Sequence, residues 1–114
     1  MNFHYLKSVQ EQEDGVRGKM LTPEDAYVFM PLSPGGRFVM DGVNTDLDIV
    51  FINVVGTIIG TRRMVKEKGG AEVPPDAFAA IEGLPGFLDR ADRRSATAWN
   101  EVLEGYTDAE GPIG

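Results

Sequence analysis

The chain has 114 residues, which is enough for one domain with a single hydrophobic core and too few for two. Its 18 acidic and 11 basic residues give a net charge of −7, and such a field disfavours a general nucleic-acid binder. The chain has no cysteine and a single histidine, His4, which excludes disulfides, thiolate chemistry and a histidine-cluster metal site.

The N-terminal residues have neither the basic start nor the apolar run of a secretory signal. No segment approaches the roughly 18 consecutive apolar residues of a membrane span. We therefore expect a chain that is not secreted by a signal peptide, that is cytoplasmic or part of a virion, and that contacts no membrane.

The first third of the chain predicts two short strands. Residues 1–9 alternate loosely between apolar and polar side chains and predict the first strand, and the acidic residues 10–15 predict a solvated loop. Residues 22–25, Thr-Pro-Glu-Asp, have the cap, proline and acids of a helix start and predict one helical turn. The apolar residues 26–32 predict the second strand, ended by a turn at residues 33–36.

Residues 38–64 form the predicted centre of the fold. Asp48–Ile52 and Thr57–Ile59 are β-branched and aromatic runs, and the residues between them begin with Asn53 and end with Gly56. This composition predicts a β-hairpin. Because neither run alternates cleanly, we expect both faces of the hairpin to be covered.

Oxygen-bearing side chains gather just before that hairpin, at Asp41, Asn44, Asp46 and Asp48. Hard cations prefer clustered oxygens, but the spacing matches no calcium loop. We expect no metal ion here, and acids that accept hydrogen bonds from nearby backbone amides.

The order of residues in this region resembles a known protein family. The segments that carry the resemblance are Arg17-Gly18-Lys19-Met20, Ala26-Tyr27-Val28-Phe29, Phe38-Val39-Met40, Asn44, Leu47-Asp48-Ile49-Val50-Phe51-Ile52, Gly56, Ile58-Ile59 and Met64. Residues 17–64 thus resemble domain-of-unknown-function family 192, which implies a compact, mostly antiparallel β fold and no established reaction. The chain departs from the family at Val39, where the family prefers tryptophan, and after Met64, where the family's closing segment is not recognisable.

The resemblance implies two alternative roles for its polar positions. In one, Arg17, Asn44 and Asp48 line a cleft, with Asp48 as base or anchor, Asn44 as hydrogen-bond donor and Arg17 as anion clamp. In the other, the same side chains hold loops together. The second is favoured, because most polar side chains bond to backbone or water.

The C-terminal half changes in composition after the predicted β-rich core domain, residues 1–68. Residues 69–76 are rich in glycine and proline and predict a connector. Residues 77–106 predict a helical extension packed on the core. A short helix is predicted at residues 75–83, starting within the connector, and a longer one at residues 88–104, where apolar side chains recur at helical spacing. Residues 107–114 predict an irregular tail.

Several exposed-looking side chains are candidates for contact with a protein partner. Arg62, Arg63, Lys66 and Lys68 place four basic residues within seven positions, which indicates either a solvated strand end or a contact patch. The other candidates lie in the terminal segments: Phe3, Tyr5, Pro112 and Ile113.

The sequence therefore predicts an α+β fold, with a compact antiparallel β-sheet or partial barrel centred on the 38–64 hairpin region and two C-terminal helices. No catalytic residue set is recognisable, so we expect a non-enzymatic interaction module without metal or cofactor that binds other protein subunits. A decoration or cement protein of a phage capsid would fit. The alternative is a small ligand-binding or enzymatic domain that uses a cleft near Arg17, Asn44 and Asp48.

Overall fold

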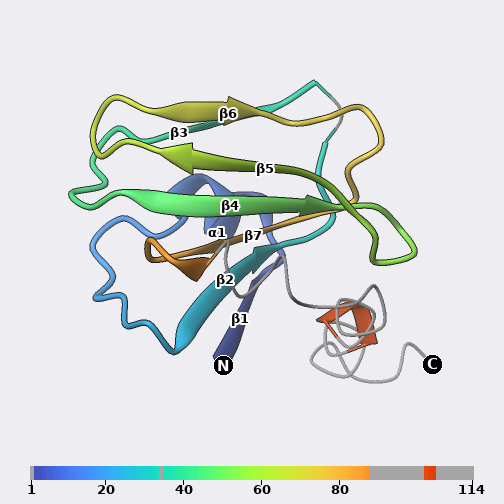
Figure 1. The fold of residues 1–114 in the computed structure, drawn as a ribbon, viewed down its shortest axis with the longest axis horizontal. Coiled ribbons are helices and arrows are strands. Elements are labelled where there is room, and N and C mark those ends of the chain that lie inside the picture. The colour runs from blue at the N-terminus through green and yellow to red at the C-terminus, as the bar shows by residue number, and fades with distance from the viewer. Residues whose placement is uncertain (1, 34, 88–101, 105–114) are drawn as a thin grey trace.

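The computed structural model describes residues 2–33, 35–87 and 102–104 (Figure 1). Its elements are β1 (Asn2–Leu6), α1 (Val9–Asp14), β2 (Asp25–Phe29), β3 (Arg37–Val39), β4 (Leu47–Ile52), β5 (Ile58–Met64), β6 (Gly70–Glu72) and β7 (Ala79–Gly83). Residues 102–104 are also helical. Within the described ranges, no helix has the length and apolar character needed to cross a membrane.

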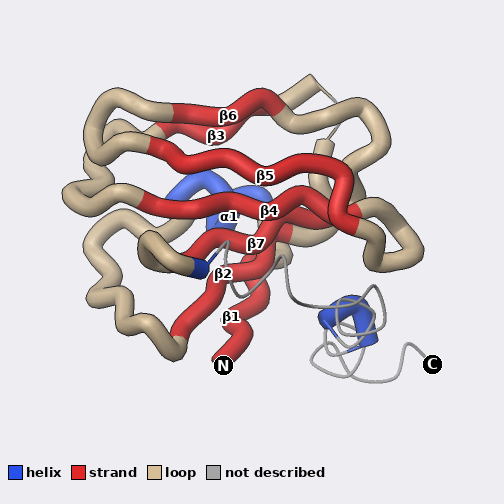
Figure 2. The backbone as a smooth tube through the Cα atoms, in the orientation of Figure 1, coloured by secondary structure: helices blue, strands red, loops and turns tan. Residues whose placement is uncertain are grey.

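The strands form two sheets (Figure 2). The larger sheet has five strands in the order β1-β2-β7-β4-β5, and the smaller one pairs β3 with β6. All pairs are antiparallel except β1 with β2, which is parallel. The predicted α+β class is confirmed, but the main sheet is mixed rather than antiparallel, because β1 runs in the same direction as β2.

The predicted central hairpin is present as β4 and β5. These strands pair from Leu47 opposite Met64 to Ile52 opposite Ile58. In the turn between them, the Asn53 side-chain oxygen accepts hydrogen bonds from two backbone amides, at 3.1 and 3.0 Å. Gly56 adopts a φ of +83°, a conformation that glycine reaches without strain. The hairpin is therefore determined by local sequence.

One face of the large sheet packs against the β3–β6 sheet, and we call it the inner face. Phe38 of β3 reaches across to it, with ring centroids 4.9 Å from Phe29 and 6.0 Å from Phe51. The buried side chains of this inner cluster include Phe29, Met40, Leu47, Ile49, Phe51 and Met64. The predicted 38–64 region thus begins with β3, which pairs with β6 in the smaller sheet and covers the inner face of the large sheet.

The opposite, outer face is covered by residues close to the C-terminus. Phe87 and Val102 are each 1% exposed and pack with side chains from β2, β4 and β7. A Cβ atom at Gly83 would lie 3.0 Å from the Phe87 ring, so glycine lets this ring approach the strand. The Tyr5 hydroxyl donates a hydrogen bond to the Val102 carbonyl at 2.9 Å, which ties β1 to the same cover.

The prediction of a helix at residues 75–83 was wrong, because Ala79–Gly83 is the strand β7. All five of its residues are buried, and it lies between β2 and β4 in the large sheet. A short apolar run covered on both faces has no alternation to distinguish it from a helix. The predicted connector, residues 69–76, likewise contains the strand β6. Most of the predicted helix at 88–104, and the tail at 107–114, lie outside the described residues.

The solvated loop predicted at residues 10–15 was also wrong, because α1 occupies Val9–Asp14. A capping box begins this helix: the Ser8 hydroxyl accepts from the Glu11 amide, and the Glu11 carboxylate accepts from the Ser8 amide, both at 3.0 Å. The helical turn predicted at residues 22–25 is a non-helical turn that leads directly into β2.

Candidate ligand-binding site

Helix α1 covers the inner face without packing onto it. None of its residues is buried. It is held at its start by the capping box and further along by Gln12, whose side-chain amide donates to the Leu6 carbonyl at 3.0 Å and to the Pro31 carbonyl at 3.2 Å. Because no side chain of α1 enters the core, space remains between the helix and the sheet.

That space is a cavity of about 470 Å³ bounded by α1, β3 and the inner face. Its volume lies within the range of pockets that hold small organic molecules. Buried apolar side chains form much of its wall: Phe29, Met40, Val43, Leu47 and Val73. Exposed lining residues form its mouth, which we define as Val9, Glu13, Asp14, Arg17, Ser33, Arg37 and Val39.

The cavity contains one deeply buried carboxyl group, that of Glu82 on β7. Glu82 is 4% exposed and lies between Tyr27 of β2 and Ile49 of β4 in the sheet register. Strand alternation places it on the inner face with Ala80. Among the described residues, none donates a hydrogen bond to its carboxyl group, and burial raises the pKa of Glu82 to about 8.

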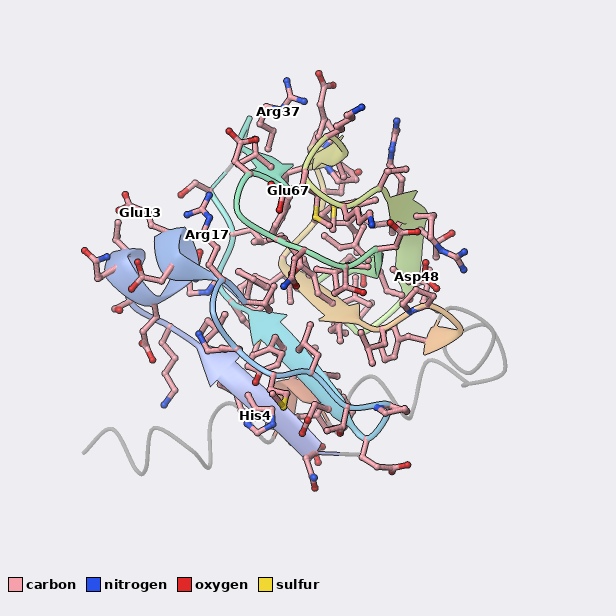
Figure 3. The ribbon with its side chains drawn as sticks, turned by 90° about the vertical axis from the view of Figure 1, so that its left-hand side faces the viewer. His4, Glu13, Arg17, Arg37, Asp48 and Glu67 are labelled. Carbon is pink, nitrogen blue, oxygen red and sulfur yellow. The ribbon has the colours of Figure 1, made fainter. Side chains whose placement is uncertain are left out.

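Arg17 lies at the mouth of this cavity and connects α1 to the loop after β3 (Figure 3). Its Nε donates to the Asp41 carbonyl at 2.6 Å, and its Nη1 donates to the Glu13 carbonyl at 2.9 Å. The side chain also packs over Gly42, where an added Cβ would lie 3.3 Å from the Arg17 Cδ. The guanidinium thus holds two backbone segments together at the edge of the cavity.

The three residues of the sequence-predicted cleft are not brought together. Asp48 is fully buried on the opposite side of β4 from Leu47 and Ile49, so it faces away from the cavity that Arg17 borders (Figure 3). It forms an ion pair with Arg63, which also donates from Nη2 at 3.1 Å, and it accepts from the Gly86 amide at 3.0 Å. Asn44 is exposed in the loop before β4.

The predicted partner-contact residues have several different environments. Phe3 and Tyr5 are half-buried and pack against the outer-face cluster, and Arg63 is paired with Asp48. Their side chains are therefore used within the chain. Arg62, Lys66 and Lys68 are exposed. Pro112 and Ile113 lie outside the described residues.

A second polar cluster lies at the edge of the large sheet, around the single histidine. The His4 Nε2 lies 3.0 Å from an oxygen of Asp25, and the His4 ring stacks on Tyr27 at 4.7 Å. The hydrogen bond with His4, followed by those from Thr22, lowers the pKa of Asp25. His4 is exposed while Tyr27 is buried, and the cluster joins β1 to β2, which indicates a role in pairing these strands.

The described part of the chain has no group of three histidine, cysteine, aspartate or glutamate side chains placed to hold a metal ion. Glu82, the carboxyl group that the cavity isolates, is a residue that the sequence analysis missed. It lay in a predicted helix, where a glutamate is ordinary. Recognising residues 79–83 as a strand would have placed Glu82 on the same face as Ala80. That this face is buried follows only from the neighbouring elements in the tertiary structure.

No protein-family model matches the chain, and no curated protein matches it in sequence. Two of the solved structures that share the fold cover most of this chain. One is a protein of unknown function from Novosphingobium aromaticivorans DSM 12444, with a TM-score of 0.70, 19% identity, and coverage of 81% of this chain and 69% of the other. The other is a candidate transcription regulator from Sinorhizobium meliloti 1021, with a TM-score of 0.71, 16% identity, and coverage of 82% and 76%. At these identities, the likeness shows the fold alone.

Proposed function

We propose that this chain is a small-molecule-binding domain whose site is the cavity beneath α1. The observation that carries the proposal is the Glu82 carboxyl group, which is buried at the cavity without a hydrogen-bond donor among the described residues. A buried polar group without a partner lowers stability, and a bound ligand can supply the missing contact. This proposal moves the site predicted from Arg17, Asn44 and Asp48 to a cavity of which only Arg17 is a part.

The rest of the cavity supports the same role. An apolar wall with a few polar groups is the usual composition of a ligand pocket, and a strongly perturbed pKa is frequent at functional sites. Helix α1 forms one side of the cavity and buries none of its residues, so a ligand that enters need not displace packed side chains from the helix.

A pair of matched substitutions tests this proposal. Val39→Trp adds a large ring at the mouth, where Val39 is 48% exposed, and Val54→Trp adds the same ring at the exposed β4–β5 turn, outside the cavity lining. Binding of 1-hexanol, followed by NMR shifts of cavity residues, should weaken at least fivefold in Val39→Trp and stay unchanged in Val54→Trp. Equal binding by both variants, or none by the unaltered protein, contradicts the proposal.

An interaction module within a larger assembly is the second candidate function. Val54 and Val55, at the tip of the β4–β5 turn, are 66% and 60% exposed, and adjacent exposed apolar side chains favour a contact with another protein. An accessory protein of a phage capsid is one form of this proposal. The resemblance to domain-of-unknown-function family 192 is a separate prediction, which implies a fold and no reaction. Light scattering over a range of protein concentrations tests self-association, and Val54→Ser with Val55→Ser should abolish it.

A further inference from the structure

The carboxyl group of Glu82 is placed where a ligand, rather than the protein, can complete its contacts. Its backbone is fixed on both sides, by Tyr27 of β2 and Ile49 of β4, so the side chain has little freedom to move out to solvent. It is 4% exposed, it lines the cavity, and burial is the cause that raises its pKa to about 8. Near neutral pH the free protein therefore holds this carboxyl group mostly protonated.

The net charge of the chain favours a cation over an anion in the cavity. Helix α1 contributes the carboxylates of Glu13 and Asp14 to the mouth, and the whole chain has a net charge of −7. Arg17 and Arg37 also line the mouth and keep their positive charges, and the Arg17 guanidinium is oriented by the carbonyls of Glu13 and Asp41. The charges at the mouth thus balance, and the net negative charge of the whole chain favours the approach of a cation over that of an anion.

Two further cations, Arg37 and Lys19, lie near the cavity. Arg37, at the mouth, stands opposite Glu72 in the β3–β6 register. Lys19 donates from Nζ to the Gly15 carbonyl at 2.6 Å and lies over the Tyr27 ring at 5.7 Å. Tyr27 is the neighbour of Glu82 on β2. No charged side chain among the described residues forms an ion pair with Glu82.

We propose that the cavity binds an apolar primary amine, whose ammonium group donates hydrogen bonds to Glu82 while its hydrocarbon part contacts the apolar wall. This inference rests on the proposed binding function and adds the chemical class of the ligand. An ammonium group supplies three donors and a positive charge, whereas an alcohol supplies one donor and no charge. A ligand carboxylate would place a second negative charge beside Glu82 or require a second proton.

The proposal predicts that the affinity for the amine depends on pH, whereas the affinity for a neutral alcohol does not. An ammonium group pairs with the ionised carboxylate, so its binding below pH 8 releases one proton from Glu82 to solvent. Affinity should rise about tenfold per pH unit up to about pH 8 and then stay level until the amine itself deprotonates near pH 10. Binding of a neutral alcohol of the same length should not rise in this range.

Isothermal titration of hexylamine and 1-hexanol between pH 6 and pH 9 tests the inference, on the full chain and on Glu82→Gln. The unaltered protein should prefer the amine by at least tenfold at pH 8.5 and release a proton at pH 7, measured in buffers of different ionisation enthalpy. Glu82→Gln should bind the two ligands with similar affinity and without pH dependence. Glu24→Gln, at an exposed glutamate, is the matched control and should behave as the unaltered protein.

The outcomes separate this inference from the binding function on which it rests. If the unaltered protein binds 1-hexanol and hexylamine equally at every pH, the cavity is a ligand site but Glu82 does not select the ammonium group, and the inference fails. If neither compound binds, both proposals fail. The pH dependence of the unaltered protein decides the matter even where Glu82→Gln does not fold, because a flat profile for the amine overturns the inference.

Discussion

At the scale of single residues, two buried carboxyl groups on neighbouring strands have opposite environments. Asp48 on β4 has an ion pair with Arg63 and accepts from the Gly86 amide. Glu82 on β7 faces the other side of the sheet and has no such partner among the described residues. A buried charge is tolerated when it is paired, whereas an unpaired carboxyl group takes up a proton. Asp48 therefore serves structure, and Glu82 is left available for a ligand.

The stability of the unliganded protein should depend on pH through Glu82. Its pKa rises from 4.5 to about 8 on folding, so its contribution to stability is fully present below pH 4.5 and is lost as pH rises to about 8. The loss amounts to roughly 5 kcal/mol at most, and less where the fold relaxes around the charge. In urea unfolding between pH 5 and pH 9, this decline should be absent from Glu82→Gln and retained by the control Glu24→Gln. Parallel profiles for all three proteins contradict the prediction.

At the scale of elements, α1 is a short helix that depends on its cap. It has six residues, none of them buried, so tertiary packing contributes little to its stability. Ser8 and Glu11 satisfy backbone amides at its start, and the Gln12 side chain connects it to the carbonyls of Leu6 and Pro31. The wall of the cavity is therefore stabilised by a few hydrogen bonds.

Removal of the cap should loosen this wall while the sheets persist. Ser8→Ala should cost about 1 kcal/mol, because the Glu11 amide loses its acceptor. Hydrogen exchange should speed up at the amides of α1 and remain slow in β4, which serves as the internal reference. The affinity of Ser8→Ala for 1-hexanol should also fall, because this wall of the cavity is loosened. Unchanged exchange in α1 would show that the helix is held by contacts other than its cap.

The elements also show where sequence reasoning succeeded and why it failed elsewhere. The β4–β5 hairpin was predicted because its β-branched runs and its Asn53–Gly56 turn are local signals. The capping box of α1 was equally local, since Ser8 and Glu11 stand three residues apart, and attention to it would have corrected the predicted loop. The identity of β7 was not local, because Ala79–Gly83 is a strand only through its pairing with β2 and β4.

At the scale of the whole molecule, one sheet supports both hydrophobic clusters. The inner cluster includes Met64 from β5, and the outer cluster includes Phe87, and each side chain is 1% exposed. Because the strands of the large sheet supply side chains to both faces, loss of packing on either face weakens the same hydrogen-bonded structure. The two clusters should therefore unfold together.

Truncation on either face tests this coupling. Phe87→Ala and Met64→Ala should each lower the stability by about 3 kcal/mol, since both leave a cavity in a packed cluster. Both should shift the midpoint of a single urea transition followed by circular dichroism. Val54→Ala, at an exposed site, should change stability by less than about 0.5 kcal/mol. A second transition in either core variant would mean that the two faces unfold independently.

The sequence by itself determined the strands whose signals lie within a few neighbouring residues, above all the hairpin of β4 and β5 and the second strand, β2. Only the tertiary structure decided that residues 79–83 form a central strand, that α1 stands over a cavity, and that Glu82 faces it. The physical reason is that hydrogen bonding in a turn is a property of adjacent residues. The burial of Glu82 depends instead on β2, β4 and α1, which are distant from it along the chain.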